Sequence, residues 1–135
     1  MSATLRVAAG ALLNRRGKVL LARRAADAHQ GGLWEFPGGK IEAGESESQA
    51  LARELDEELG IELVTARPLI RVRHAYPDRV IDLAVWRVSR WRGEPWGRLG
   101  QALRWVAPER LEDYPMPAAD RPVLAALRAK WGRGG

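Results

Sequence analysis

Three glutamates in one acidic segment, Glu54, Glu57 and Glu58, are the residues of this chain best suited to chemistry. On a helix, their i, i+3 and i+4 spacing brings the three carboxylates onto one surface patch. Carboxylates this close repel one another, raise one another's pKa and weaken the helix. Oxygen ligands of this kind bind hard divalent cations such as Mg²⁺, which is usually shared with substrate phosphates. For an isolated acidic run, a solvated helix face is the commoner explanation.

The spacing of the flanking residues favours a metal site over a solvated face. From Gly39 to Ile61 the chain reads GKIEAGESESQALARELDEELGI. Five residues separate Gly39 from Glu45, and seven separate Glu45 from Arg53, which directly precedes the glutamates. This order, with Gly60 near its end, matches every fixed position of the Nudix box. The chain therefore resembles a Nudix hydrolase.

The helix that must carry the glutamates is readable from its two ends and its apolar face. Ser46 and Gln49 form a capping-box pattern, which places Ser46 at the N-cap. Gly60 suits the left-handed residue that ends a helix. Arg53 lies four residues before Glu57 and is placed to steady it. The apolar stripe expected to face the core consists of Ala50, Leu51, Leu55 and Leu59.

Strands and turns are predicted on both sides of this helix. Residues 5–13 predict a buried strand that turns at 15–18 into a second strand at 18–23. Residues 66–76 and 80–91 predict a hairpin connected by Pro77, Asp78 and Arg79. Four further elements are expected: a loop at 93–97, a strand at 103–106, a helical turn at 108–112, and a last helix at 120–131 with Val123, Leu124, Leu127 and Trp131 on its apolar face.

The composition indicates one globular domain over residues 1–135. Apolar residues make up 46% and charged residues 29%, and no cysteine is present for disulfides or metal binding. The apolar run 7–13 is short and contains Gly10, so it predicts a strand rather than a signal peptide, and no run approaches the ~18 to 20 apolar residues of a membrane helix. We expect a cytoplasmic monomer. Its formal charge of +5 attracts polyphosphates and also nucleic acid.

Two segments before the acidic helix hold further candidate ligand contacts. Arg23 and Arg24 form a pair that is commonly mere surface charge, but beside a metal–polyphosphate site such a pair suits a phosphate clamp. Trp34 is expected in the core. Phe36 is expected either in the core or as an aromatic wall for a base, where stacking contributes roughly 1–3 kcal/mol.

Beyond the box, the chain resembles the MutT branch of the Nudix family. The resemblance rests on the runs 23–29, 34–40, 77–79 and 93–97, and it covers roughly residues 5–127. It implies the Nudix fold, an α/β (α+β) arrangement in which a mixed β-sheet is sandwiched between helices and the box forms a loop-helix-loop. It also implies a diphosphatase that converts 8-oxo-dGTP to 8-oxo-dGMP and pyrophosphate, which sanitises the nucleotide pool and avoids mutation.

The same resemblance implies roles for individual residues. It implies that Glu54 positions or deprotonates the attacking water, that Arg53 orients the carboxylates, and that Glu45 is an auxiliary acid. The implied ligands of Mg²⁺, or of Mn²⁺ in its place, are the side chains of Glu54, Glu57 and Glu58 and the backbone carbonyl of Gly39. The implied substrate contacts are Arg24, Phe36, Lys40, Arg79 and Asp120.

One departure from the MutT pattern concerns the metal site. That pattern carries a further glutamate in the loop before a Gln-x-x-x-Trp stretch, which here is Gln101 to Trp105. The matching position is Leu99, preceded by Arg98. Glu94 is a candidate substitute, and the sequence leaves the number of metals and the identity of the base open.

A second departure concerns base recognition, because Asp120 stands where the MutT pattern has an asparagine that reads 8-oxoguanine. An asparagine donates to O6 and accepts from the N7–H that oxidation creates. An ionised aspartate repels O6 unless burial keeps it protonated, but it suits the amino group of cytosine. Residues 114–120 resemble the NudG branch of CTP and modified-dCTP pyrophosphohydrolases. Alternatively, Asp120 only caps its helix.

Three functions follow from these observations. The first is a Mg²⁺-dependent 8-oxo-dGTP diphosphatase, and the second is a pyrophosphohydrolase of CTP or modified dCTP. The third is a non-catalytic nucleotide- or nucleic-acid-binding domain, which the basic charge suggests. The intact box argues against the third, because a binding module does not need Arg53 together with the glutamates. We expect a nucleoside triphosphate as the partner, with no stable nucleic-acid complex and no membrane.

Overall fold

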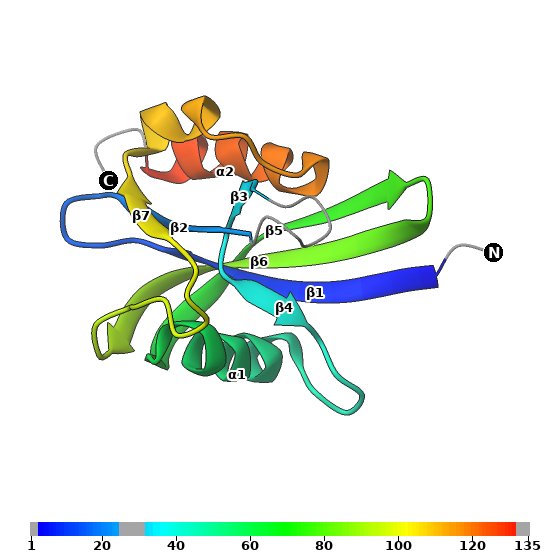
Figure 1. Cartoon of the computed structure of the whole chain (residues 1–135), viewed down its shortest axis with the longest axis horizontal. Helices are drawn as coiled ribbons and strands as arrows, with labels where there is room; N and C mark the ends of the chain where they lie inside the picture. The colour runs from blue at the N-terminus through cyan, green and yellow to red at the C-terminus, as the bar shows by residue number, and fades with distance from the viewer. Residues whose placement is uncertain (1–2, 25–31, 132–135) are drawn as a thin grey trace.

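The computed structural model describes residues 3–24 and 32–131 of the chain, with side chains up to residue 129. Seven strands form two sheets, and two helices lie on opposite sides of the larger sheet (Figure 1). The elements in chain order are β1 (Ala3–Leu12), β2 (Val19–Arg23), β3 (Trp34–Glu35), β4 (Gly38–Lys40), α1 (Glu47–Leu59), β5 (Glu62–Tyr76), β6 (Arg79–Arg92), β7 (Leu103–Val106), the 3₁₀ turns η1 (Pro108–Asp113) and η2 (Ala118–Asp120), and α2 (Arg121–Trp131).

The larger sheet is mixed. Its strand order is β4-β1-β6-β5, in which β1 runs parallel to β6 and the other neighbouring pairs are antiparallel. The smaller sheet has the order β3-β2-β7. This arrangement of a mixed sheet between α1 and α2 confirms the predicted α/β (α+β) fold (Figure 1). No helix in the described part of the chain is long and apolar enough to cross a membrane.

Two apolar clusters hold the helices onto the two faces of this sheet. On one face, α1 packs its stripe against β1 and β6, where Leu12 and Val88 are fully buried. On the other face, α2 packs with η1 over the opposite side of the same strands, where Ala9 and Val85 are buried. Alternate residues of one strand point to opposite faces, so β1 and β6 serve both clusters at once.

Helix α1 forms as its sequence predicts. The Ser46 hydroxyl accepts from the Gln49 N–H at 3.1 Å, and the Gln49 side chain accepts from the Ser46 N–H at 2.9 Å. Gly60 ends the helix at φ 67°, in the left-handed region that favours glycine. The predicted core stripe Ala50, Leu51, Leu55 and Leu59 is fully buried. Both ends of the acidic segment are therefore fixed by local interactions.

Several element boundaries differ from the sequence prediction. The hairpin strands β5 and β6 extend beyond the predicted 66–76 and 80–91, because register shifts at residues 63–70 break the alternation that marks a strand. The extended ends pair Glu62 with Arg92 through an ion pair of 2.7 Å. The last helix begins at Arg121, and Asp120 lies in the preceding η2 turn. Residues 25–31 of the predicted loop and the side chain of Trp131 lie outside the described residues.

Candidate functional site

The acidic face of α1 is organised around the guanidinium of Arg53. Its Nε and Nη2 donate to the two carboxylate oxygens of Glu45 at 2.8 and 3.0 Å, a bidentate pair. Nη1 donates to Glu54 at 2.9 Å and Nη2 to the carbonyl of Lys40 at 2.9 Å. The predicted contact with Glu57 is present but longer, at 3.4 Å. Arg53 thus ties the helix to the loop before it and to β4.

The electrostatics of this cluster follow from the pairing. The hydrogen bonds from Arg53, together with a backbone N–H, lower the pKa of Glu45 from 4.5 to about 2. In return, Glu45 raises the pKa of Arg53. Glu45 is therefore an anion at any physiological pH. It acts on the site through Arg53, whose other nitrogen atoms hold Glu54.

Glu54 lies directly against the backbone of Gly39. A Cβ atom added to Gly39 would lie 2.4 Å from the carboxyl carbon of Glu54, closer than any real contact. Gly39 is not in the left-handed region, so glycine is required here by close approach and not by backbone conformation. Gly39 and Glu54, both fixed positions of the Nudix box, therefore lie in direct contact.

Glu58 lies beside Glu54 and next to the backbone of Gly38. Burial, followed by the hydrogen bond and the charge of the neighbouring Glu54, raises the pKa of Glu58 to about 9, although the Gly38 N–H opposes the shift. Two carboxyl groups in contact cannot both ionise cheaply, so the charge of Glu54 adds to the effect of burial on Glu58. Glu57 points away, with 56% of its side chain exposed and its carboxylate on Arg53.

These residues suit a divalent cation shared with a ligand better than a fully protein-bound one. No group of three or more acidic, histidine or cysteine side chains in the described ranges has the geometry to hold a metal by itself. Mg²⁺ is usually bound by one or two carboxylates together with substrate phosphates. Glu54, Glu58 and the backbone at Gly39 fit that donor set, whereas Glu57 would have to leave Arg53 to join it.

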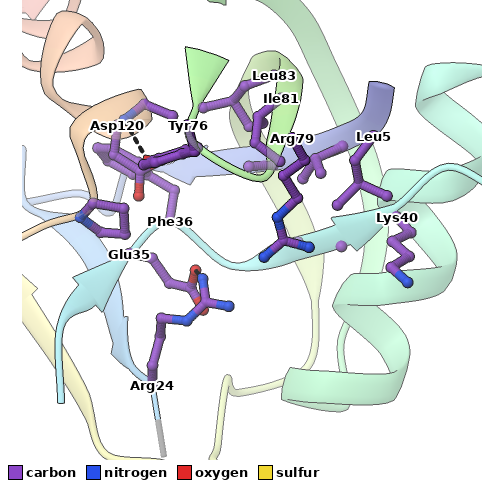
Figure 2. Close-up of a pocket in the computed structure, with 16 residues that line it drawn as sticks. Leu5, Arg24, Glu35, Phe36, Lys40, Tyr76, Arg79, Ile81, Leu83 and Asp120 are labelled. Carbon is purple, nitrogen blue, oxygen red and sulfur yellow. Dashed lines mark hydrogen bonds and ion pairs between the residues drawn. The ribbon is translucent and has the colours of Figure 1, made fainter. Parts of the chain in front are cut away.

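A cavity of about 240 Å³ opens beside Gly39 (Figure 2). All five predicted substrate contacts line it: Arg24, Phe36, Lys40, Arg79 and Asp120. Its apolar walls come from β1, β5 and β6, through Leu5, Tyr76, Ile81 and Leu83. Phe36 has only 3% of its surface exposed, which confirms the predicted core position, and it also lines the cavity. The structure thus joins segments from five parts of the chain into one ligand-sized space.

At one end of the cavity, Asp120 is buried near a second carboxylate. Burial, and then the negative charge of Glu35, raise the pKa of Asp120 from 3.8 to about 7, with Arg24 opposing the shift. Glu35 makes an ion pair of 2.7 Å with Arg24, yet burial still raises its pKa. No hydrogen bond to the Asp120 carboxylate occurs within the described residues, so the contact expected of a helix cap is not found.

Arg79 lines the cavity away from Asp120, on the side of Lys40 (Figure 2). Its Nε is buried and has no hydrogen-bond partner among the described residues. A buried donor without an acceptor costs free energy of roughly 1–3 kcal/mol, which a bound ligand with an acceptor would recover. The arginine is therefore arranged for an acceptor that the described part of the chain does not supply.

The loop after β6 covers the end of α1 and contains the departure at Leu99. Arg98 donates to the backbone carbonyls of Asp56 and Glu58, and the Gln101 side chain donates to the same Glu58 carbonyl at 2.9 Å. Leu99 is 72% exposed and lines a second cavity of about 450 Å³ together with Glu58. Glu94 is exposed and lines neither cavity. The loop therefore secures the helix but places no carboxylate beside Glu58.

Sequence reasoning missed two polar residues of the cavity beside Gly39, Glu35 and Tyr76. Glu35 stands inside the run 34–40 that carries the MutT resemblance, but its burial beside Arg24 depends on the pairing of β2 with β3. Tyr76 ends a strand, and its position opposite η2 depends on the packing of distant segments. Only the resemblance of the surrounding runs could have pointed to either.

The chain belongs to the NUDIX domain family, whose model matches residues 8–126. It is 44% identical over 124 residues to an 8-oxo-dGTP diphosphatase of Escherichia coli, covering 92% of this chain and 96% of that protein. It is also 44% identical over 119 residues to a CTP pyrophosphohydrolase of Escherichia coli, covering 88% of each.

Solved structures agree with the family assignment. The E. coli ORF135 protein superposes with a TM-score of 0.85 at 40% identity, covering 99% of this chain and 96% of that one. A structure from a study of the MutT proteins of Aliivibrio salmonicida and Vibrio cholerae superposes with a TM-score of 0.82 at 34% identity, covering 94% and 98%. The resemblance to Nudix hydrolases of the MutT type, seen in the sequence, is confirmed.

Proposed function

We propose that the protein is a Mg²⁺-dependent nucleoside triphosphate diphosphatase that converts 8-oxo-dGTP to 8-oxo-dGMP and pyrophosphate. The observation that carries this proposal is the junction at Gly39. On one side of Gly39 lie the Glu54 and Glu58 carboxylates, and on the other lies a cavity lined by all five predicted substrate contacts. A nucleotide bound across this junction has its base in the cavity and its phosphates at the carboxylates.

The residues around the junction have distinct tasks in this reaction. Bound Mg²⁺ supplies charge neutralisation of the polyphosphate and activation of water. Glu54 holds the attacking water and takes its proton, while Arg53 fixes the Glu54 carboxylate through the 2.9 Å hydrogen bond. The water oxygen forms a bond to phosphorus and the P–O bond of the α–β anhydride breaks, which yields 8-oxo-dGMP and pyrophosphate. Lys40 and Arg79 contribute positive charge at the cavity.

Base recognition in this proposal depends on the protonation of Asp120. With its pKa at about 7, the buried carboxyl is largely protonated at slightly acid pH and divided between both forms at neutral pH. The protonated form donates to O6 and accepts from N7–H, which is the pattern that distinguishes 8-oxoguanine from guanine. The similarity to an E. coli protein named 8-oxo-dGTP diphosphatase supports 8-oxo-dGTP as the substrate.

The same residue favours a second candidate, a CTP pyrophosphohydrolase. An ionised Asp120 accepts hydrogen bonds only, and therefore suits the N4 amino group of cytosine. A relative of that name is equally similar to this chain, at 44% identity. The two candidates share the catalytic junction and differ in the charge of one side chain.

The test of catalysis is the variant Glu54→Gln, which keeps the side-chain shape and removes the carboxylate. We expect nucleotide turnover with Mg²⁺ to fall by about a hundredfold to ten-thousandfold, the usual contribution of a general base. The matched control is Glu109→Gln, at an exposed position on η1. Turnover that survives in Glu54→Gln would refute the catalytic assignment. A wild-type protein that binds nucleotide without turnover would favour the non-catalytic domain.

A further inference from the structure

The turn that carries Asp120 lacks a cap of its own. In η2, Pro117 stands at the N-cap and offers no side-chain hydrogen bond. The first N–H groups of a helical turn have no acceptor within the turn, and a Ser, Thr, Asp or Asn at the N-cap commonly supplies one. The Asp120 N–H donates to the Pro117 carbonyl at 3.0 Å. The N–H of buried Ala119 therefore needs an acceptor from outside the turn.

Tyr76 supplies the missing acceptor from the far end of the sheet. Its hydroxyl accepts a hydrogen bond from the Ala119 N–H at 3.0 Å, joining residues 43 apart in the chain. Figure 2 shows this bond as a dashed line beside Asp120. The His74 ring contacts the Tyr76 ring edge-on, with 4.5 Å between centroids. One side chain thus forms part of the cavity wall and holds the turn that delivers Asp120.

We infer that Tyr76 is a positioning residue for base selectivity, which fixes Asp120 against the base by capping η2. This inference rests on the proposed function of the cavity. The Tyr76 ring lines the cavity where the base would lie, and its hydroxyl holds the turn that carries Asp120. One rigid side chain therefore fixes the distance between this part of the cavity wall and Asp120. The Asp120 carboxyl group has no hydrogen bond within the described residues, so the turn determines where it lies.

The variant Tyr76→Phe removes only the hydroxyl and keeps the ring. We expect the ratio of kcat/KM for 8-oxo-dGTP to that for dGTP to fall about tenfold, the effect of losing one hydrogen bond. The loss should appear mainly in KM for 8-oxo-dGTP. The matched control is Tyr114→Phe at the chain's other tyrosine, which packs edge-on against Trp34 and has no hydroxyl hydrogen bond among the described contacts.

A second background separates positioning from general loosening. If Tyr76 acts through Asp120, the variant Tyr76→Phe should not change selectivity further in a protein that already carries Asp120→Ala. An equal loss of selectivity in Tyr114→Phe, or an additive loss in the Asp120→Ala background, would overturn the inference. So would an unchanged selectivity ratio in Tyr76→Phe.

Hydrogen exchange in the wild-type protein tests the bond without any variant. The Ala119 amide should exchange at least about tenfold more slowly than an amide without an acceptor, since it must break the bond to Tyr76 first. An Ala119 amide that exchanges at the unprotected rate would overturn the inference. A wild-type protein with a protected Ala119 amide but no nucleotide turnover would instead refute the proposed function.

Discussion

Replacing Asp120 with asparagine should change how the stability of the protein depends on pH. The pKa of Asp120 rises from 3.8 in the unfolded chain to about 7 in the folded protein, because burial and Glu35 disfavour the charged form. A carboxyl group with a raised pKa binds its proton more tightly in the folded state. Its full contribution is therefore present below pH 3.8 and is lost as the pH rises through about 7.

The size of this effect follows from the two pKa values. At about 1.4 kcal/mol for each pKa unit, burial of the ionised carboxylate costs about 4 kcal/mol at pH 8. Asparagine is uncharged and escapes this cost. The free energy of unfolding of Asp120→Asn minus that of the wild type should therefore increase between about pH 4 and pH 8. The groups that set the shift, Glu35 and Arg24, are present in both proteins.

Urea unfolding followed by tryptophan fluorescence measures this difference, since the chain has six tryptophans. The wild type and Asp120→Asn are compared at each pH, so titrations common to both proteins cancel. We expect the asparagine variant to be the more stable protein at pH 8 and to lose this advantage near pH 4. A difference that stays constant across this range would refute the assignment of a protonated Asp120 and with it the proposed reading of 8-oxoguanine.

Three further predictions follow from the site. The variant Gly39→Ala should fold but lose about a hundredfold in kcat/KM, because the new methyl group displaces the Glu54 carboxylate by about 1 Å. Turnover assays and thermal unfolding of the same preparation test the two parts of this prediction. Glu45→Gln should be less stable than the wild type at pH 7, because Arg53 lowers the pKa of Glu45 and so stabilises the folded state when Glu45 is ionised. In urea unfolding, the difference in free energy of unfolding between the two proteins should shrink as the pH falls from 4.5 through about 2, where Glu45 becomes protonated. Arg79→Met should raise KM about tenfold without lowering the free energy of unfolding, because its buried Nε has no partner among the described residues. A lower stability with unchanged KM would contradict this prediction.

The helix that carries the carboxylates could be predicted from sequence because its determinants are local. The capping box at Ser46 and Gln49 and the left-handed Gly60 act within one turn of their own positions, and the apolar stripe is visible as a helical spacing within the segment itself. Each is present as expected. The short strand 103–106 also has the predicted bounds. The helix ends depend on near neighbours in the chain, and the stripe and the strand are marked by local residue patterns, so a sequence pattern is enough to find them.

The interior of the cavity could be predicted only in part, because its determinants join distant segments. The burial of Glu35 depends on the smaller sheet, and the bond from Tyr76 to Ala119 crosses 43 residues. The orientation of Glu57 is another case, since helical spacing places it with Glu54 but Arg53 holds it outward. Spacing shows which side chains share a helix face, whereas the partner that each one meets depends on tertiary packing.

The most direct test of the account is a comparison of kcat/KM with Mg²⁺ for 8-oxo-dGTP, dGTP and CTP on one preparation, with the products identified. The account predicts release of pyrophosphate and a preference for 8-oxo-dGTP over dGTP on the order of a thousandfold or more, as expected of a site that pairs with the N7–H. A preference for CTP would mean that Asp120 reads the base as an ionised acceptor. That result, or the absence of turnover for all three nucleotides, would contradict the proposed function.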